Sequence, residues 1–283
     1  MTQINSHIGN KLLISNEEEH LAFLLRERNL RRANEKMRPA VFKETIYTKY
    51  VKRILDLLIA LPAFIILLPF NIIFAVCTLA DVGFPVLFRQ ARVGRAGRSF
   101  VVTKFRNMNE KKDSDGKLLP PSERVTKFGL FMRKYSLDEL LNFWSVIKGD
   151  MSIIGPRPMP VFIVDRMCER HKSRLKVRPG LECPRVVKID RKIAGAWQEE
   201  FENAVWYVEN ISFITDIKMV FRLIAMTFAI KKRSQNAGGL GYFVGYDDYL
   251  NATSTKRLEV DFPNAPYLKK ADTGERKYES KYC

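Results

Sequence analysis

Residues 54–80 read ILDLLIALPAFIILLPFNIIFAVCTLA and decide the fold, because no other stretch of the chain is as long and as apolar. The segment holds one charged residue, Asp56, and its length suits a helix in a membrane. Neither flank is poor in positive charge, so both ends favour the cytosol. The flanking basic residues are Lys49, Lys52 and Arg53 before the segment and Arg89, Arg92, Arg95 and Arg98 after it.

Two prolines determine the expected shape of this segment. Pro62 and Pro69 each remove a backbone donor and can kink a helix. Together with the basic flanks they favour a re-entrant helical hairpin, which enters the membrane and turns back. A helix that spans the membrane and a helix buried in a soluble core are the alternatives.

Composition limits the partners of the chain. Among 283 residues, 48 are Lys or Arg and 31 are Asp or Glu, which gives a formal net charge of +17. Such a charge indicates an anionic partner: phosphates, anionic lipid or nucleic acid. Cys168 and His171 have a spacing seen in metal sites, but with only Cys183 nearby as a third ligand we expect reduced thiols and no zinc.

Outside the apolar segment the pattern predicts an α+β fold, mostly helical, with a small cytosolic catalytic domain. A polar helical extension of residues 1–48 carries no signal peptide. The re-entrant helix follows in 49–80, then the catalytic domain in 81–232 and a loosely ordered tail in 233–283. We expect a surface helix in 16–37 capped by Asn16, short strands in 83–108, and helices from Lys127 to Trp206.

A second membrane candidate begins at Ser212, with apolar residues at helical spacing interrupted by charges. This pattern suits a helix lying in the membrane interface and equally an ordinary amphipathic helix on a soluble core.

The stretch YSLDELLNFWSVIKGDMSIIGPRP, residues 135–158, is the richest in groups that could react. Asp138 and Glu139 are adjacent acids at a predicted helix start, where the helix dipole favours ionised Asp138, available as a nucleophile. Ser136 and Glu139 also match a capping box, so the alternative for Glu139 is purely structural. If the substrate is a diphosphate, we expect Mg²⁺ as cofactor, held by Asp138 or Glu139 together with the substrate phosphates.

Cationic residues accompany these acids. Arg157 lies in the stiff Gly-Pro-Arg-Pro loop, and its planar fork fits phosphate oxygens, although a surface Arg on a rigid turn gives the same pattern. Arg133, Lys104 and Arg106 add further positive charge. Each alone is more often a solvated surface group, but their sum favours phosphate binding.

A series of short motifs between Lys52 and Lys232 resembles the bacterial sugar transferases, the monotopic phosphoglycosyl transferases. In order these are KRILDLLIA, FRQARVG, TKFRNM, RVTKFG, SLDEL, IKGDMSIIGPRP, VRPG and WYVENISFITDIKMVF. The resemblance implies a re-entrant helix broken at a Ser-Pro pair. That position here is Leu68 and Pro69, so the proline is retained and the serine is not.

By the same resemblance, Asp138 is the nucleophile and Glu139 the second acid, which helps to deprotonate or position the acceptor. Arg133 and Arg157 are implied to bind phosphates. The implied reaction moves a sugar 1-phosphate from a nucleotide sugar, with uridine as the base, to a polyprenyl phosphate such as undecaprenyl phosphate. A nucleoside monophosphate leaves, and an aspartyl phosphosugar is the intermediate.

The implied setting is the cytosolic face of the bacterial inner membrane, where such a step initiates capsule, exopolysaccharide, O-antigen or glycoprotein assembly. Membrane lipid is then a partner, and a homodimer is compatible with the sequence. After VRPG the chain departs from the resemblance: LECPRVVKIDRK stands where a stretch like ITGLAQVNGR is usual. The alternative function is therefore an impaired relative acting as a membrane scaffold. A nucleic-acid binder is disfavoured, because no binding motif accompanies the charge.

Overall fold

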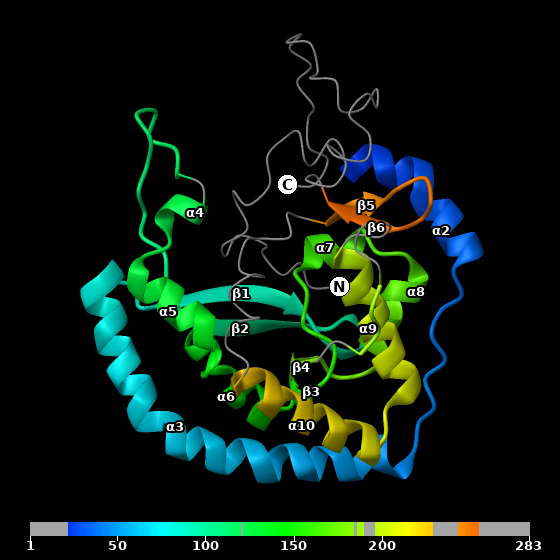
Figure 1. Cartoon of the computed structure of the whole chain (residues 1–283), viewed down its shortest axis with the longest axis horizontal. Helices are drawn as coiled ribbons and strands as arrows, with labels where there is room; N and C mark the ends of the chain where they lie inside the picture. The colour runs from blue at the N-terminus through cyan, green and yellow to red at the C-terminus, as the bar shows by residue number, and fades with distance from the viewer. Residues whose placement is uncertain (1–21, 120, 184–185, 190–195, 229–242, 255–283) are drawn as a thin grey trace, which may run out of the picture.

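The structure is a computed structural model that describes residues 22–119, 121–183, 186–189, 196–228 and 243–254. Its architecture is α+β and mostly helical, as predicted (Figure 1). The sheets in these residues are two-stranded: antiparallel β1 (Leu87–Val93) with β2 (Ser99–Phe105), parallel β3 (Ser152–Ile154) with β4 (Gly180–Glu182), and antiparallel β5 (Phe243–Tyr246) with β6 (Ala252–Ser254).

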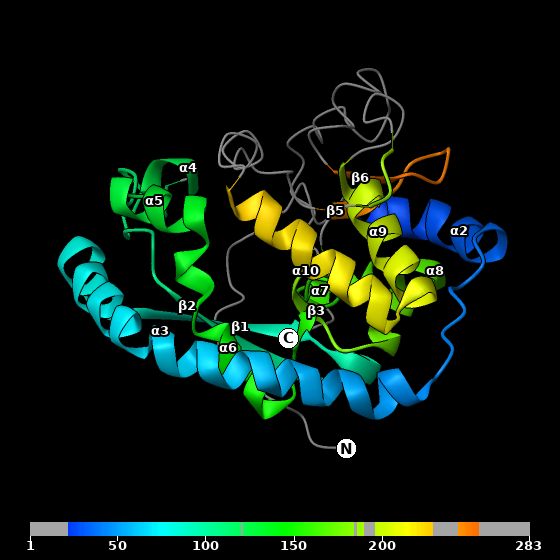
Figure 2. The same cartoon turned by 60° about the horizontal axis from the view of Figure 1, so that its bottom comes forward.

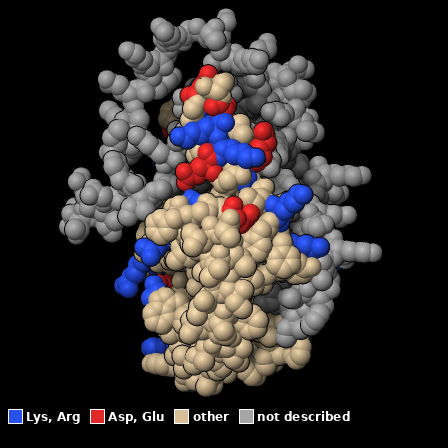
Figure 3. All heavy atoms as spheres, turned by 90° about the vertical axis from the view of Figure 1, so that its left-hand side faces the viewer, with Lys and Arg blue, Asp and Glu red and all other residues tan. Residues whose placement is uncertain are grey.

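Helix α3 (Lys52–Val82) forms the base of the molecule and bends as it runs beneath the strands (Figures 1 and 2). In the described residues it is the one helix long and apolar enough to cross a membrane, and only 11% of its apolar window is buried. That exposure argues against the alternative of a core helix. Figure 3 shows a lower surface with few charged side chains, and most of the charged side chains in this view lie above it.

The expected hairpin at Leu68 and Pro69 is not seen as two helices joined by a turn. Helix α3 continues through Pro62 and Pro69 for 31 residues. A proline removes one backbone donor, which permits a bend, but the neighbouring turns can keep their hydrogen bonds and the helix does not end.

The polar residues of α3 face the protein rather than the apolar surface. Lys52 and Asp56 are buried, and the Lys52 ammonium donates to Asp216 Oδ2 at 2.6 Å. Asp56 Oδ1 accepts from the Ser152 hydroxyl at 2.9 Å and from the Ile153 amide at 3.1 Å. These contacts attach the start of the apolar helix to β3 and to α10 (Phe213–Phe228).

The helical segments between α4 and η5 are short, whereas α9 and α10 are longer, and together they surround the strands (Figure 1). In chain order they are α4 (Pro121–Arg124), α5 (Lys127–Tyr135), η4 (Leu137–Glu139), α6 (Asn142–Lys148), α7 (Val161–Asp165), α8 (Glu169–Lys172), η5 (Ser173–Lys176), α9 (Ala196–Asn210) and α10. The predicted strands between 83 and 108 are confirmed as β1 and β2, joined through η3 (Arg95–Gly97). Residues 94–98 form the turn, in which Gly97 has a left-handed backbone with φ of 75°.

The two ends of the described chain pack together, which the sequence did not predict. The early helices η1 (Arg26–Leu30) and α2 (Arg31–Lys36) lie beside the β5–β6 hairpin (Figure 1). The Asn29 amide donates to Tyr246 O at 2.9 Å. The expected loosely ordered tail is therefore wrong for residues 243–254, whose strands are buried. The predicted cap Asn16 lies outside the described residues.

Candidate functional site

The two adjacent acids lie on η4, a single 3₁₀ turn between α5 and α6. Helix α5 ends at Tyr135, and the next residue, Ser136, has a left-handed backbone with φ of 56°. The Ser136 side chain makes no capping hydrogen bond to η4. The predicted capping box from Ser136 to Glu139 is therefore wrong. Because Ser136 closes the preceding helix, the Glu139 side chain is free to point toward β2 and the Gly-Pro-Arg-Pro loop.

Asp138 is nearly enclosed by protein, with 6% of its surface exposed. Its Oδ2 accepts from the Asn107 amide at 3.1 Å. Burial raises the pKa of this carboxyl, and Lys104 partly opposes that rise. The sequence had suggested that a helix dipole would favour the ionised form, but desolvation is the larger effect.

Glu139 has the opposite environment, although it is the next residue. One oxygen, Oε1, accepts from Lys104 Nζ at 2.5 Å and from Arg157 Nη2 at 2.6 Å. Burial would raise its pKa, but the attraction of Arg157 and Lys104 outweighs burial and lowers the pKa to about 2. Glu139 in turn raises the pKa of Arg157. Glu139 is thus a permanent anion held between two cations.

A pocket of about 290 Å³ opens beside these groups, lined by Lys104, Glu139, Arg157, Asn142 and Arg92 among others. Arg92 comes from β1, and the sequence did not single it out as a site residue. Its Nη1 donates to Pro158 O at 3.1 Å, while its Nε is buried without a hydrogen-bond partner in the described residues. Burial and the neighbouring Arg157 lower its pKa to about 10.

The predicted phosphate-binding residues are not all brought together. Lys104 and Arg157 line the pocket, and Arg133 lies behind Asp138, donating to Asn107 Oδ1 at 2.8 Å. Neither Arg133 nor Arg106 lines the pocket, and Arg106 points to a different part of the molecule. Its guanidinium donates to the carbonyls of Val82 and Gly83, at the C-terminal end of α3.

Asn107 is a site residue that sequence reasoning missed, although it stands in the quoted motif TKFRNM. Its amide contacts the Asp138 carboxylate, and its carbonyl oxygen accepts from Arg133. A close backbone approach holds it there, because a Cβ on Gly129 would lie 2.2 Å from Asn107 O. The sequence did hold a signal: Asn107 lies two residues after the end of β2, the strand that carries Lys104.

The predicted metal ligands Asp138 and Glu139 differ in how well they fit Mg²⁺. Mg²⁺ is commonly held by one or two carboxylates together with substrate phosphates. Asp138 fits, because its buried carboxylate has no direct ion pair and an added cation would offset its desolvation. Glu139 fits less well, because two cations already contact Oε1. Within the described ranges no three His, Cys, Asp or Glu side chains form a metal cluster.

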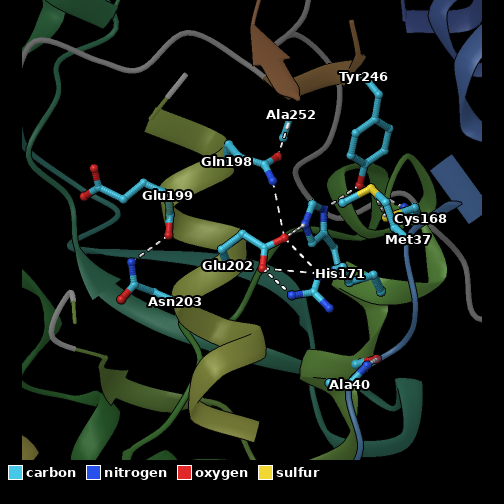
Figure 4. A network of polar contacts seen from close by, with 12 residues as sticks. Met37, Ala40, Cys168, His171, Gln198, Glu199, Glu202, Asn203, Tyr246 and Ala252 are labelled. Carbon is cyan, nitrogen blue, oxygen red and sulfur yellow. Dashed lines mark hydrogen bonds and ion pairs between the residues drawn. The ribbon is translucent and has the colours of Figure 1, made fainter. Parts of the chain in front are cut away.

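The Cys168 and His171 pair belongs to a buried network on the far side of α9 (Figure 4). His171 Nδ1 lies 2.7 Å from the Tyr246 hydroxyl, and its Nε2 lies 3.1 Å from Glu202 Oε1. Burial opposes the charged imidazole, but Cys168 and Glu202 raise the pKa of His171 overall. Cys183 packs in a different apolar cluster, so the metal-like spacing does not produce a three-residue site.

The comparisons with known proteins agree with this site. The family model described as "Bacterial sugar transferase" matches residues 47–229, which include α3, the acid pair and the pocket. The chain belongs to the bacterial sugar transferase family. The predictions of this family and of a transferase enzyme are confirmed by that match. The β5–β6 hairpin and the helices before residue 47 lie outside it.

Curated relatives carry related names. The chain is 41% identical over 139 residues to EpsL of Bacillus subtilis, an uncharacterised sugar transferase, covering 49% of this chain and 68% of that protein. It is 34% identical over 181 residues to an Aeromonas hydrophila UDP-N-acetylgalactosamine-undecaprenyl-phosphate N-acetylgalactosaminephosphotransferase, covering 62% and 43%. It is 30% identical over 197 residues to a Klebsiella pneumoniae UDP-glucose:undecaprenyl-phosphate glucose-1-phosphate transferase, covering 64% and 40%. The match thus spans about two fifths of the last two proteins.

Proposed function

We propose that this sugar transferase moves a sugar 1-phosphate from a UDP sugar to undecaprenyl phosphate through an intermediate on Asp138, as the initiating step of bacterial glycan assembly. The observation that carries the proposal is the contrast between the two acids. Among the described residues Asp138 has no direct ion pair with a cation, whereas Glu139 is bound by two. The names of two relatives, which specify UDP sugars and undecaprenyl phosphate, supply the substrate classes.

In the proposed first half reaction, an Asp138 oxygen attacks the phosphorus that carries the sugar. The anhydride bond to the nucleotide breaks, and uridine monophosphate leaves with the bonding electrons. The Asn107 side-chain amide donates one hydrogen bond to the Asp138 carboxylate. This bond orients the carboxylate for attack on the phosphorus. In the second half reaction, a phosphate oxygen of the acceptor attacks the same phosphorus and releases the Asp138 carboxylate.

The cations of the pocket would stabilise the charge that develops on the phosphates. Lys104, Arg157 and Arg92 line one cavity, and the anion Glu139 fixes the first two in position. The sequence resemblance had implied that Glu139 helps to deprotonate or position the acceptor. A carboxylate with a pKa of about 2 is a weak base, so we assign Glu139 the positioning role.

Mg²⁺ is the proposed cofactor, with Asp138 as the protein carboxylate that would hold it. Bound there with the diphosphate, the ion would neutralise charge on the phosphate oxygens. Asn107 and Arg133 would keep the carboxylate oriented.

The proposed location is the cytosolic face of the inner membrane, with α3 as a re-entrant helix and α10 in the interface. Two features support it. The outward side of α3 is apolar, and α10 exposes Phe213, Ile214 and Phe221. A bend in α3 would let both of its ends remain on the side of the acids, at the depth of the lipid phosphates.

The test is release of uridine monophosphate by the full chain in lipid nanodiscs, given undecaprenyl phosphate, Mg²⁺ and a panel of UDP sugars. Asp138→Asn should lower the rate by at least about a thousandfold, because it removes the nucleophile. Asp150→Asn is the matched control, since Asp150 pairs with Lys148 away from the pocket, and it should retain the rate. Acid-quenched wild type should carry a phosphosugar on Asp138 by mass spectrometry.

Full turnover by Asp138→Asn would overturn the assigned nucleophile. No release by folded, membrane-bound wild type across the panel would instead favour the scaffold alternative. The altered stretch after Gly180 would then be the first suspect, because Glu182 in β4 lies 4.0 Å from Arg157.

A further inference from the structure

A second pocket of about 370 Å³ lies at the start of the apolar helix. It is formed by the chain leading into α3, the η3 turn, the start of β3 and the residues after η5. It shares no lining residue with the pocket beside Asp138 and Glu139. The phosphates that react beside the acids therefore have a site of their own, and this second pocket needs a separate account.

Four basic side chains line the second pocket: Lys52, Arg95, Lys176 and Arg178. Lys52 is neutralised by Asp216 at 2.6 Å and lies 3.9 Å from Asp56. The other three have no ion pair within the described residues.

Two acids, Glu44 and Asp56, also line the pocket, and among the cations without an ion pair Arg95 and Arg178 are close enough to repel one another. Burial lowers the pKa of Arg178, and Arg53 and Arg95 lower it further. Arg178 Nε donates to Gly149 O at 3.1 Å, and Lys176 Nζ donates to Ala40 O at 2.8 Å. Arg95 is exposed and has no hydrogen bond from its side chain in the part of the chain that the structure describes. A bound anion would relieve this repulsion.

The surroundings of the pocket are apolar and exposed. Ile46 and Ile54 on the way into α3 are 78% and 58% exposed, and Phe213 and Ile214 at the start of α10 are 48% and 63% exposed. Tyr47 holds these two elements together, with its ring 6.0 Å from that of Phe213. An anion bound in the pocket would therefore have apolar protein surface beside it, as a lipid headgroup with its chains requires.

We propose that this second pocket binds the phosphate of an anionic phospholipid headgroup and so fixes the start of α3 at the membrane surface. The proposal rests on the membrane location given under the proposed function. Arg95, Lys176 and Arg178 supply the positive charge. Asp56 Oδ2, which is buried and has no hydrogen-bond partner in the described residues, could accept from a headgroup hydroxyl.

The experiment measures binding of short-chain lipids to the full chain in a neutral detergent by thermophoresis. The probes are dihexanoyl phosphatidylglycerol, dihexanoyl phosphatidylcholine and inorganic phosphate. We expect saturable binding of phosphatidylglycerol, about thirtyfold weaker in the Arg95→Gln/Lys176→Gln double variant, because each basic group at an anionic lipid surface contributes about fivefold. Arg98→Gln is the matched control, since Arg98 is exposed on the same turn but does not line the pocket, and it should bind as wild type.

Three outcomes would overturn the proposal. The first is equal affinity of wild type for phosphatidylglycerol and phosphatidylcholine. The second is equal affinity of wild type and the double variant for phosphatidylglycerol. The third is equal affinity of wild type for inorganic phosphate and phosphatidylglycerol, which would make the site one for free phosphate. The nucleotide-release assay in the same variants separates this idea from the proposed function. If wild type and the double variant release nucleotide normally but bind phosphatidylglycerol equally well, the lipid site alone is overturned. If wild type binds phosphatidylglycerol selectively but releases no nucleotide, the proposed function alone fails.

Discussion

Replacing Glu139 by Gln should destabilise the protein by an amount that depends on pH. The substitution keeps the shape of the side chain but removes the anion between Lys104 Nζ and Arg157 Nη2, at 2.5 and 2.6 Å. The folded state lowers the Glu139 pKa from 4.5 to about 2, and at about 1.4 kcal/mol per pKa unit this corresponds to about 3 kcal/mol of stabilisation at neutral pH. The side chain is 21% exposed, so solvent screens the pair only in part.

The sign of the pH effect follows from the direction of that shift. A lowered pKa means that the folded state favours the anion, so the stabilisation is complete above 4.5 and is lost as the pH falls toward about 2. The difference in unfolding free energy between wild type and Glu139→Gln should therefore shrink from about 3 kcal/mol at neutral pH to roughly half of that near pH 3.

The assay is urea unfolding of the detergent-solubilised full chain, followed by tryptophan fluorescence at neutral pH and near pH 3. Glu110→Gln is the control. Glu110 pairs with Arg106 at 3.2 Å but is 71% exposed, so its loss should cost under about 1 kcal/mol. A Glu139→Gln protein as stable as wild type at neutral pH, or a difference that stays constant on acidification, would refute the two-cation account of Glu139.

Three further predictions test the site and its support. Burial raises the pKa of Asp138 above its ordinary 3.8, and the nucleophile must be ionised to attack. Nucleotide release should therefore fall on acidification at a pH above 3.8. A rate that stays constant from about pH 4 to about pH 8 would contradict this. Gly129→Ala places a Cβ 2.2 Å from Asn107 O, so unfolding in urea should show a loss of about 1 to 3 kcal/mol together with slower turnover, and unchanged behaviour would disprove the close approach. Tyr246→Phe removes a hydroxyl with two buried partners and should cost about 1 to 3 kcal/mol, measured against Tyr249→Phe at a ring that is 81% exposed, where no loss is expected.

The sequence was sufficient for elements whose signal is local. The length and apolarity of residues 54–80 predicted a long exposed helix, and α3 is that helix. Short runs of Val, Leu and Phe separated by Gly, Pro and Arg predicted the strands that became β1 and β2. The sequence could not show whether the helix bends or ends at Pro69. A proline permits either, and the hydrogen bonds of the neighbouring helical turns decide between them.

The environment of the acids could not be read from their neighbours in the chain. Asp138 and Glu139 are adjacent, yet the partners of Glu139 come from Lys104 and Arg157, 35 and 18 residues away. The local pattern favoured a capping box, and it failed because Ser136 adopts a left-handed backbone that closes the preceding helix. Arg106 shows the same limit: it lies two residues after Lys104 but turns to the end of α3.

The ends of the chain that lie outside the family match also support the site. Arg174 is 3% exposed, and its Nη2 donates to Arg157 O at 2.7 Å, behind the guanidinium that holds Glu139. Its own guanidinium lies over the ring of Phe201, 5.7 Å from the centroid.

Phe201 packs at 4.9 Å against Phe243 of the β5–β6 hairpin, in an apolar cluster that also contains Ala33 of the early helix α2. Burying an arginine is unfavourable unless it is paired and hydrogen-bonded, and Arg174 has both a bond to Arg157 O and a carboxylate, Glu200, at 3.9 Å. The hairpin packs against Phe201, whose ring lies beneath the Arg174 guanidinium. The sequence placed both ends outside the family resemblance and gave them no assigned role. The β5–β6 hairpin and helix α2 instead pack around Phe201 and so help to hold Arg174 and Arg157 in place. No local pattern in either end of the chain could reveal these contacts.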